Sequence, residues 1–390
     1  MGGCSSQSKS QGDTHKSGFE LQFHGQPGAK GVSSSHHGIK FGTNITPAKG
    51  KDHDRCSYQR FDLSRLKGPE DSLLYGFGLY DGHGLSSAVA DVASANMLGS
   101  MAAQCKGMVD RSALDKNGTS LDTEEGMKAM TALLGEDGSP QFNRQTSRMI
   151  DEAFLKVRDL VHDKFYGQRV GSTATVVLVS SVNGGAEWSI ACGWVGDSRA
   201  AVVEPGGKSA RALTEDHRLD LPREKARVVA EQEKEAEAGL PGTRRTLVAN
   251  RVSATTGQKG PLALYNEVTK VSTMVTRSLG DSMAASALSG EPEFAFDTAP
   301  DGSRLILASD GIWDVISVAK AASIIKGTKD ARKAALLLCA AAKKIRLYGG
   351  HAPDDISAIV VNLDKSSVAP ALPKAPGLFA MRGFFRSMSE

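Results

Sequence analysis

Apolar positions along the chain form short runs with β-strand character, separated by longer stretches at helical spacing. The strand-like runs are rich in β-branched and aromatic residues and end at turns that contain Gly or Asp. They cover residues 73–80 (LLYGFGLY), 173–180 (TATVVLVS), 188–194 (WSIACGW), 199–203 (RAAVV), 271–277, 304–309 (RLILAS) and 357–363 (SAIVVNL). Helices are predicted over residues 85–103, 143–165, 223–238, 318–326 and 330–345.

The order of these elements predicts the fold class. Strand runs interleaved with helical pairs favour an α+β fold, with sheets inside and helices outside. We expect a β-sandwich of two mostly antiparallel sheets flanked by helices, which is a four-layer α-β-β-α arrangement. One domain over residues 41–364 accounts for the periodic segments, whereas residues 1–40 and 365–390 are predicted to be a flexible arm and a flexible tail.

Composition and charge narrow the class of protein. The 390 residues are 40% apolar and 23% charged, as in ordinary globular proteins. The net charge of +3 comes entirely from the first fifty residues, so the remainder gives no electrostatic reason to expect a nucleic-acid partner. The five cysteines form no CxxC pair, which indicates neither a zinc site nor a disulfide framework. No apolar run is long enough to predict a transmembrane helix or a signal core, and we expect a monomer.

Aspartates recur where predicted strands end in Gly-containing turns. They are Asp54, Asp81, Asp197, Asp281, Asp310 and Asp354. Short carboxylates at strand ends can converge at one rim of a sheet, where they repel each other unless a divalent cation is present. Because the ligands would be oxygens, without Cys or paired His, the pattern favours Mg²⁺ or Mn²⁺ over zinc.

Eight segments together resemble the metal-dependent type 2C protein phosphatases. They occur in that family's order between residues 40 and 364, and are KDHDRC (51–56), YGFGLYDGHG (75–84), GSTATVVLV (171–179), WVGDSRAAV (194–202), LTEDH (213–217), VTRSLGD (275–281), LASDGIWDVIS (307–317) and APDDISAIVV (352–361). The resemblance implies hydrolysis of phosphoserine and phosphothreonine in phosphorylated proteins, with two Mg²⁺ or Mn²⁺ ions in the active site.

The resemblance also implies roles for individual residues. Asp81 would bridge the two ions, and His83 would be the general acid that protonates the leaving alkoxide. The other residues placed at the metals are Asp54, Gly82 through its carbonyl, Asp310 and Asp354. Asp197 and Asp314 are candidates for a third, weaker ion beside Asp310, while Asp281 is expected to brace its loop.

The first motif departs from the family pattern. The family often has an arginine five residues before the motif aspartate, where it binds the substrate phosphate, and this chain has Lys49 there. With a shifted alignment, Lys51 or Arg55 could take that role. His53 stands where the family often has Glu or Gln, which leaves open a catalytically impaired scaffold that binds phosphoproteins. A hydrolase of small phosphoesters is the third alternative, with residues 218–270 as the variable flap that sets substrate choice.

The N-terminus carries a lipidation pattern. Its first six residues, MGGCSS, fit M-G-x-x-x-[ST], which predicts N-myristoylation of Gly2. Cys4 is placed for S-palmitoylation, and a second acyl chain would be needed for stable attachment. The pattern predicts a location at the cytoplasmic side of a membrane, and otherwise in the cytoplasm.

Overall fold

A computed structural model describes residues 33–36, 39–63, 73–112, 140–181, 187–238, 246–252, 259–284 and 287–364. Gly2, Cys4 and most of the arm predicted over residues 1–40 lie outside these residues, as does the tail over 365–390, but the last part of that arm forms strand β1 (Ser33–His36) and the start of strand β2 (Ile39–Thr46) and is not a flexible segment there. The domain boundaries therefore stay predictions.

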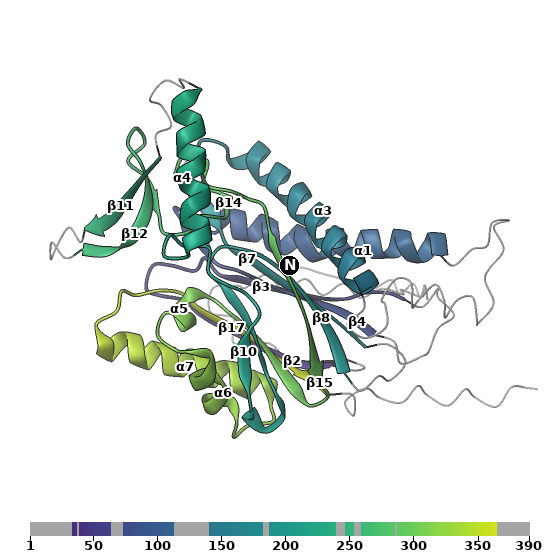
Figure 1. Cartoon of the computed structure of the whole chain (residues 1–390). Helices are drawn as coiled ribbons and strands as arrows, with labels where there is room; N and C mark the ends of the chain where they lie inside the picture. The colour runs from purple at the N-terminus through teal and green to yellow at the C-terminus, as the bar shows by residue number, and fades with distance from the viewer. Residues whose placement is uncertain are drawn as a thin grey trace, which may run out of the picture.

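Two antiparallel sheets form the centre of the molecule (Figure 1). The five-stranded sheet has the order β15 (Glu293–Pro300), β8 (Glu187–Val195), β7 (Ala174–Ser181), β4 (Leu73–Tyr80) and β3 (Arg55–Arg60). The six-stranded sheet has the order β1 (Ser33–His36), β2 (Ile39–Thr46), β17 (Ile356–Leu363), β16 (Ser303–Ala308), β9 (Arg199–Val203) and β10 (Ala210–Ala212). A short 3₁₀ turn, η1 (Pro205–Gly207), joins β9 to β10.

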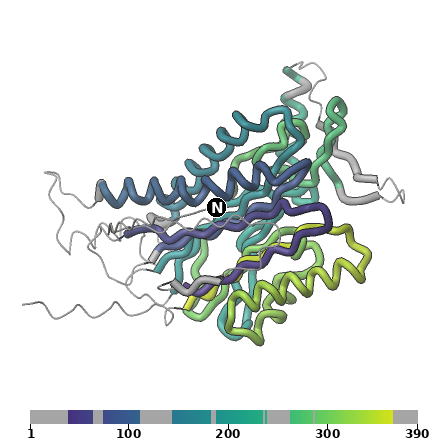
Figure 2. Tube along the Cα trace, turned by 180° about the vertical axis from the view of Figure 1, so that it is seen from behind, coloured from purple at the N-terminus to yellow at the C-terminus, as the bar shows by residue number. Residues whose placement is uncertain are grey.

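Helices cover the outer face of each sheet. α1 (Ala88–Ser112) and α3 (Pro140–Phe165) pack on the five-stranded sheet, and α5 (Asp310–Trp313), α6 (Val318–Ile325) and α7 (Ala331–Gly349) pack on the six-stranded sheet. Figure 2 shows from behind that the two helical layers lie on opposite sides of the strands. The four-layer α-β-β-α prediction is thus confirmed.

The alternation of side chains along the strands explains the layering. In β17, Ile359 and Val361 face the other sheet, whereas Ala358 and Val360 face the helices. Both faces are apolar because both are covered, so the strand reads as a continuous hydrophobic run. In β2, Gly42 lets the sheet approach α7 closely, since a Cβ there would lie 2.2 Å from the backbone nitrogen of Arg332.

Two small sheets complete the fold. β5 (Gly82–Gly84), β6 (Val170–Ser172) and β14 (Leu279–Gly280) form one of them, with β6 in the middle. The other consists of β11 (Thr246–Val252), β12 (Lys259–Asn266) and β13 (Ser272–Thr273), and it lies beside α4 (Pro222–Glu237) at one end of the sandwich (Figure 1). α4, β11 and β12 lie within the flap predicted over residues 218–270, and β13 lies just beyond it.

The strong apolar runs were predicted well, and the weaker segments were not. The strand expected over 271–277 is wrong in extent, because only Ser272–Thr273 belongs to a ladder and Val275 makes an isolated bridge. The strands that were not anticipated are β1, β2, β3, β11, β12 and β15 and the short strands β5, β6, β10 and β14. Within the described part of the chain, none of the helices combines the length and the hydropathy that crossing a membrane requires.

Candidate active site

Four of the predicted aspartates meet at one end of the sandwich. Asp81 follows β4 and Asp54 precedes β3, both on the five-stranded sheet. Asp310 opens α5 after β16, and Asp354 lies just before β17, both on the six-stranded sheet. Asp81 is close enough to interact electrostatically with the other three. Neighbouring strand ends from both sheets therefore supply one carboxylate cluster, as the sequence predicts.

Asp54 is the most deeply enclosed of these acids. Its side chain is fully buried, and Ser357 Oγ donates a hydrogen bond to Oδ2 at 2.5 Å. The other oxygen, Oδ1, is buried without a hydrogen-bond partner among the described residues. Burial raises the pKa of Asp54 to about 7; Ser357 opposes the rise and Asp355 adds to it. An oxygen left in this state is suited to coordinate a cation or to accept a hydrogen bond from a bound water.

The carboxylates of Asp81 and Asp310 are also buried beside other acids, which disfavours their ionised forms. Burial and then the neighbouring carboxylates raise the pKa of both side chains well above 3.8. For Asp81 the first of those neighbours is Asp54, and for Asp310 it is Asp197. Divalent cations would relieve this repulsion, and the donors are oxygens only. The residues present thus fit Mg²⁺ or Mn²⁺.

Glycines allow the ligand-bearing turns to approach each other. A Cβ on Gly82 would lie 2.6 Å from the carbonyl oxygen of His53, and one on Gly311 would lie 2.0 Å from that of Asp355. Contacts this short are not tolerated by any residue with a side chain, so these two positions require Gly. The turn that carries Asp81 is in this way pressed against the segment that carries Asp54.

Two side chains that were not singled out from the sequence fasten the turns. The buried Arg346 of α7 donates to the carbonyl oxygens of Gly311 at 2.7 Å, Asp310 at 2.9 Å and Ala352 at 3.0 Å. The Asp355 carboxylate accepts from the backbone nitrogens of Ala48 and His53, each at 2.7 Å. No local sequence pattern reveals Arg346, because its partners are brought close only by the fold.

His83 forms an acid–imidazole pair with Asp281. Nε2 of His83 lies 2.5 Å from Oδ2 of Asp281, and the His83 side chain is 31% exposed. Ser278 Oγ donates to the same carboxylate oxygen at 2.6 Å. Burial disfavours protonation of His83, but Asp281 outweighs it and raises the pKa of the imidazole above 6.5. Asp281 does brace its loop, and it also orients His83.

The small sheet of β5, β6 and β14 explains why His83 and Asp281, which are 198 positions apart in the sequence, lie in contact. β6 pairs with β5 on one side and with β14 on the other. Gly171 of β6 lies between the two side chains, since a Cβ there would lie 2.2 Å from Asp281 Oδ2 and 2.4 Å from His83 Nε2. Asp281 itself has a φ of +54°, a conformation that Asp adopts more readily than most residues.

Among the basic residues weighed for phosphate binding, Lys51 reaches the cluster. Its Nζ lies 3.0 Å from Asp354 Oδ1, and the lysine side chain is 46% exposed. Arg55 is buried, and it binds Asp91 at 2.6 Å and the carbonyl oxygens of Asp52 and Asp54, so its role is structural. Lys49 is exposed on the turn just before Lys51.

Asp197 and Asp314, the candidates for a third ion, also converge beside Asp310. The guanidinium of Arg218 lies among all three carboxylates. Sequence reasoning did not single out Arg218, although it directly follows the LTEDH motif.

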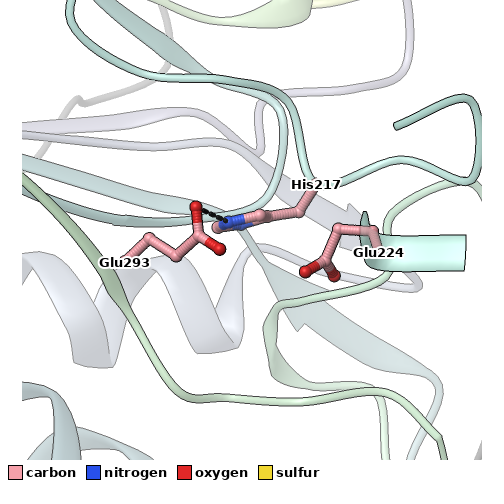
Figure 3. A group of neighbouring side chains, drawn as sticks. All are labelled: His217, Glu224 and Glu293. Carbon is pink, nitrogen blue, oxygen red and sulfur yellow. Dashed lines mark ion pairs between the residues drawn. The ribbon is translucent and has the colours of Figure 1, made fainter. Parts of the chain in front are cut away.

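A second group of potential metal ligands lies under the flap. Figure 3 shows His217 between Glu224, at the start of α4, and Glu293, at the start of β15. Both glutamates already bind arginines. Arg277 Nη2 donates to Glu224 at 2.6 Å and to Glu293 at 2.9 Å, Arg227 Nη2 donates to Glu224 at 3.0 Å, and Arg223 Nη2 donates to Glu293 at 2.6 Å. His217 Nδ1 accepts from the Gly196 backbone nitrogen at 3.1 Å, and burial lowers the pKa of this histidine to about 4. This network fastens the Asp197 turn to the flap.

Comparison with known families places most of the chain. The model of the family described as "Protein phosphatase 2C" matches residues 62–349. "Probable protein phosphatase 2C 5" of Arabidopsis thaliana is 28% identical over 347 residues, covering 87% of this chain and 66% of the relative. "Probable protein phosphatase 2C 59" of Oryza sativa subsp. japonica is 26% identical over 369 residues, covering 93% and 88%. The chain thus spans slightly less than two thirds of the first relative.

Solved structures agree with the fold. A serine-threonine phosphatase 2C from Toxoplasma gondii superimposes with a TM-score of 0.61 at 17% identity, over 86% of this chain and 99% of that one. A sex-determining protein of C. elegans gives a TM-score of 0.52 at 20% identity, over 85% of this chain and 66% of that one. At these identities the likeness concerns the architecture.

Proposed function

The chain belongs to the protein phosphatase 2C family, and on that premise we propose that it hydrolyses phosphoserine and phosphothreonine in proteins with the help of bound divalent metal ions. The observation that carries the proposal is the junction of two features at one end of the sandwich. One is the carboxylate cluster around Asp81, and the other is the His83–Asp281 pair, whose histidine belongs to the same Asp81–Gly84 turn.

The carboxylate cluster is the site for Mg²⁺ or Mn²⁺. Asp81, Asp310 and Asp354, with the carbonyl of Gly82, are the residues that would hold two ions, and Asp54 supports them from the buried side. Bound ions supply a water of lowered pKa and neutralise charge on the phosphoryl oxygens. With the charge balanced in this way, the cluster loses the repulsion that otherwise destabilises its ionised form.

The remaining residues act on the substrate. Asp281 holds the protonated form of His83 through Nε2, and the proton that His83 gives to the leaving oxygen of Ser or Thr is the one on the other ring nitrogen, Nδ1. Lys51 lies at the rim of the cluster and orients the phosphate as a single positive charge, replacing the arginine typical of the family. Lys49 is two residues away and is the competing choice for this role. Asp355 fixes the segment that carries both lysines.

Metal-dependent turnover of a phosphothreonine peptide by the purified chain tests the proposal. We expect phosphate release with Mn²⁺, its loss in EDTA, and its return when Mn²⁺ is restored. Peptide binding without turnover in Mn²⁺ would identify the scaffold alternative, and turnover of small phosphoesters alone would identify the other hydrolase. Activity that persists in EDTA would overturn the metal mechanism.

In the same assay, Lys51→Met should raise the KM for the peptide more than Lys49→Met, because Lys51 reaches the carboxylate cluster.

We also propose that the N-terminus anchors the protein to the cytoplasmic face of a membrane. The support is the MGGCSS sequence, which fits the N-myristoylation pattern at Gly2 and places Cys4 where palmitoylation could follow. Fractionation of cells should find the wild-type chain largely with membranes and Gly2→Ala largely in the soluble fraction. Cys4→Ser should give an intermediate result, because one myristoyl chain binds membranes only marginally. Identical distributions of wild type and Gly2→Ala would refute the anchor.

A further inference from the structure

Arg218 occupies the centre of the carboxylate group in which a third metal ion was anticipated. Its Nε donates to Asp197 Oδ2 at 2.7 Å, and its Nη1 donates to Asp314 Oδ1 at 3.0 Å. Nη2 makes a longer contact of 3.4 Å with Asp310 Oδ2. Each of the three guanidinium nitrogens is thus directed at a different carboxylate, and the Arg218 side chain is 20% exposed.

The backbone delivers Arg218 to this position. The preceding residue, His217, is hydrogen-bonded through its backbone nitrogen to Gly196 O at 3.0 Å, and its ring accepts from Gly196 N. Its carbonyl oxygen accepts from Thr276 N at 2.7 Å, and Arg218 itself bridges to Val275. Because Gly196 precedes Asp197, the same contacts that fix Arg218 also fix the carboxylate that it binds.

Asp197 and Asp314 each already have a cationic partner in the chain. Asp314 contacts Arg218 and also lies 3.5 Å from Arg346, so it has two cationic neighbours. Asp197 is almost fully buried and has the short Arg218 contact. Only Asp310 is held loosely, which leaves it available to the main metal centre. A guanidinium is a planar donor of fixed charge that cannot diffuse away, and a divalent ion at this point would have to displace it.

We propose that Arg218 is a built-in cation that takes the place of a third metal ion, so that the enzyme binds two divalent ions. The inference rests on the proposed function, because it presumes the two-ion centre. Arg218 is then a positioning residue: its single positive charge is shared by Asp197 and Asp314 at every metal concentration, and it holds the β8–β9 turn beside Asp310.

Counting bound Mn²⁺ tests the proposal. The purified full chain is stripped of metal and titrated with Mn²⁺ by calorimetry, and binding is checked by the loss of the free-Mn²⁺ signal in electron paramagnetic resonance. We expect two ions for the wild type and three for Arg218→Ala, because the substitution exposes Asp197 and Asp314. Adding Asp314→Asn to Arg218→Ala should return the number to two. Circular dichroism and the melting temperature establish that each variant is folded.

A second variant serves if Arg218→Ala does not fold. Asp314→Asn alone should leave the wild-type number at two, since Arg218 and not an ion is its partner. Three ions in the wild type, with one lost in Asp314→Asn, would overturn the role of Arg218 while leaving the phosphatase proposal intact. A folded Arg218→Ala that still binds two ions would also overturn it. A wild type that binds no Mn²⁺ would refute the proposed function together with this inference.

Discussion

Replacing Asp310 by asparagine is expected to abolish metal-dependent hydrolysis and, in the same protein, to stabilise the metal-free fold. Asp310 is 8% exposed, and its carboxylate faces Asp197, Asp354 and Asp314. Its charge is unfavourable without a cation and essential with one. An amide of the same shape removes the charge but is a much poorer ligand for a hard divalent ion. We expect kcat to fall by about 10³-fold or more, as for the removal of a principal electrostatic group.

The direction in which pH changes the stability of the metal-free protein follows from these pKa shifts. The pKa of Asp310 is raised above 3.8 in the folded state, so the folded chain holds protons that the unfolded chain has released. The metal-free wild type should therefore lose stability as the pH rises from about 4 through the folded-state pKa values of the cluster, one of which is about 7 for Asp54. Asp310→Asn should flatten that slope. At pH 8 in EDTA we expect the variant to melt higher by a few degrees, since about 1 kcal/mol shifts the midpoint by roughly 2–4 °C.

Melting curves at pH 5 and pH 8, in EDTA and in saturating Mn²⁺, check this prediction together with peptide turnover. Mn²⁺ should reverse the order at pH 8 by stabilising the wild type more than the variant. Asp159→Asn is the matched control, because Asp159 lies on the surface of α3 with 63% of its side chain exposed. A variant that keeps Mn²⁺-dependent turnover, or whose metal-free form melts lower than the wild type, would contradict the assignment of Asp310.

The sequence predicts those parts of the fold whose signal is local. β4, β9 and β17 are dense runs of apolar residues because both of their faces are covered, and their limits were predicted to within one residue. β15 has mostly half-buried residues at the edge of its sheet, and its apolar residues are interrupted by Asp297 and Thr298 and end at Pro300, so it lacks a dense apolar run. In β2, Gly42 and Asn44 interrupt the apolar pattern, so the sequence does not reveal that this strand is buried. The glycine is required there because the strand packs closely on α7.

The residues of the site likewise fall into those that the sequence reveals and those that only the fold brings together. Asp81 and Asp310 stand next to glycines in turns after strands, which is a pattern that a single chain displays, whereas Asp54 and Asp354 precede β3 and β17 and have no glycine beside them. The groups that control these aspartates show no such local pattern, because their contacts span the sequence. Lys51 and Asp354 are 303 positions apart, and Arg218 and Asp314 are 96 apart. The resemblance to a family supplies the ligands but not their cationic partners, and the arrangement of Arg218 could come only from the three-dimensional structure.

His83→Gln is expected to slow hydrolysis of a phosphothreonine peptide far more than hydrolysis of p-nitrophenyl phosphate. The alkoxide of Thr is a strongly basic leaving group that needs a proton, whereas nitrophenolate leaves without one. Loss of a general acid costs about 10²–10⁴-fold. We expect a fall in that range in kcat for the peptide and less than about 10-fold for the aryl ester, because glutamine keeps a hydrogen-bond donor but cannot transfer a proton.

Asp281→Asn should distinguish the effect of Asp281 on the protonation of His83 from its effect on the orientation of the imidazole. The Asp281 carboxylate raises the pKa of His83, so its removal should let His83 lose its proton at lower pH. The alkaline limb of the peptide pH–rate profile should then move to lower pH, while the aryl-ester profile moves little. His162→Gln, at a histidine with 65% of its side chain exposed on α3, is the control and should alter neither substrate. If His83→Gln slowed both substrates equally, His83 would be a residue that places the phosphate or its ligands, and the proton donor would have to be sought elsewhere.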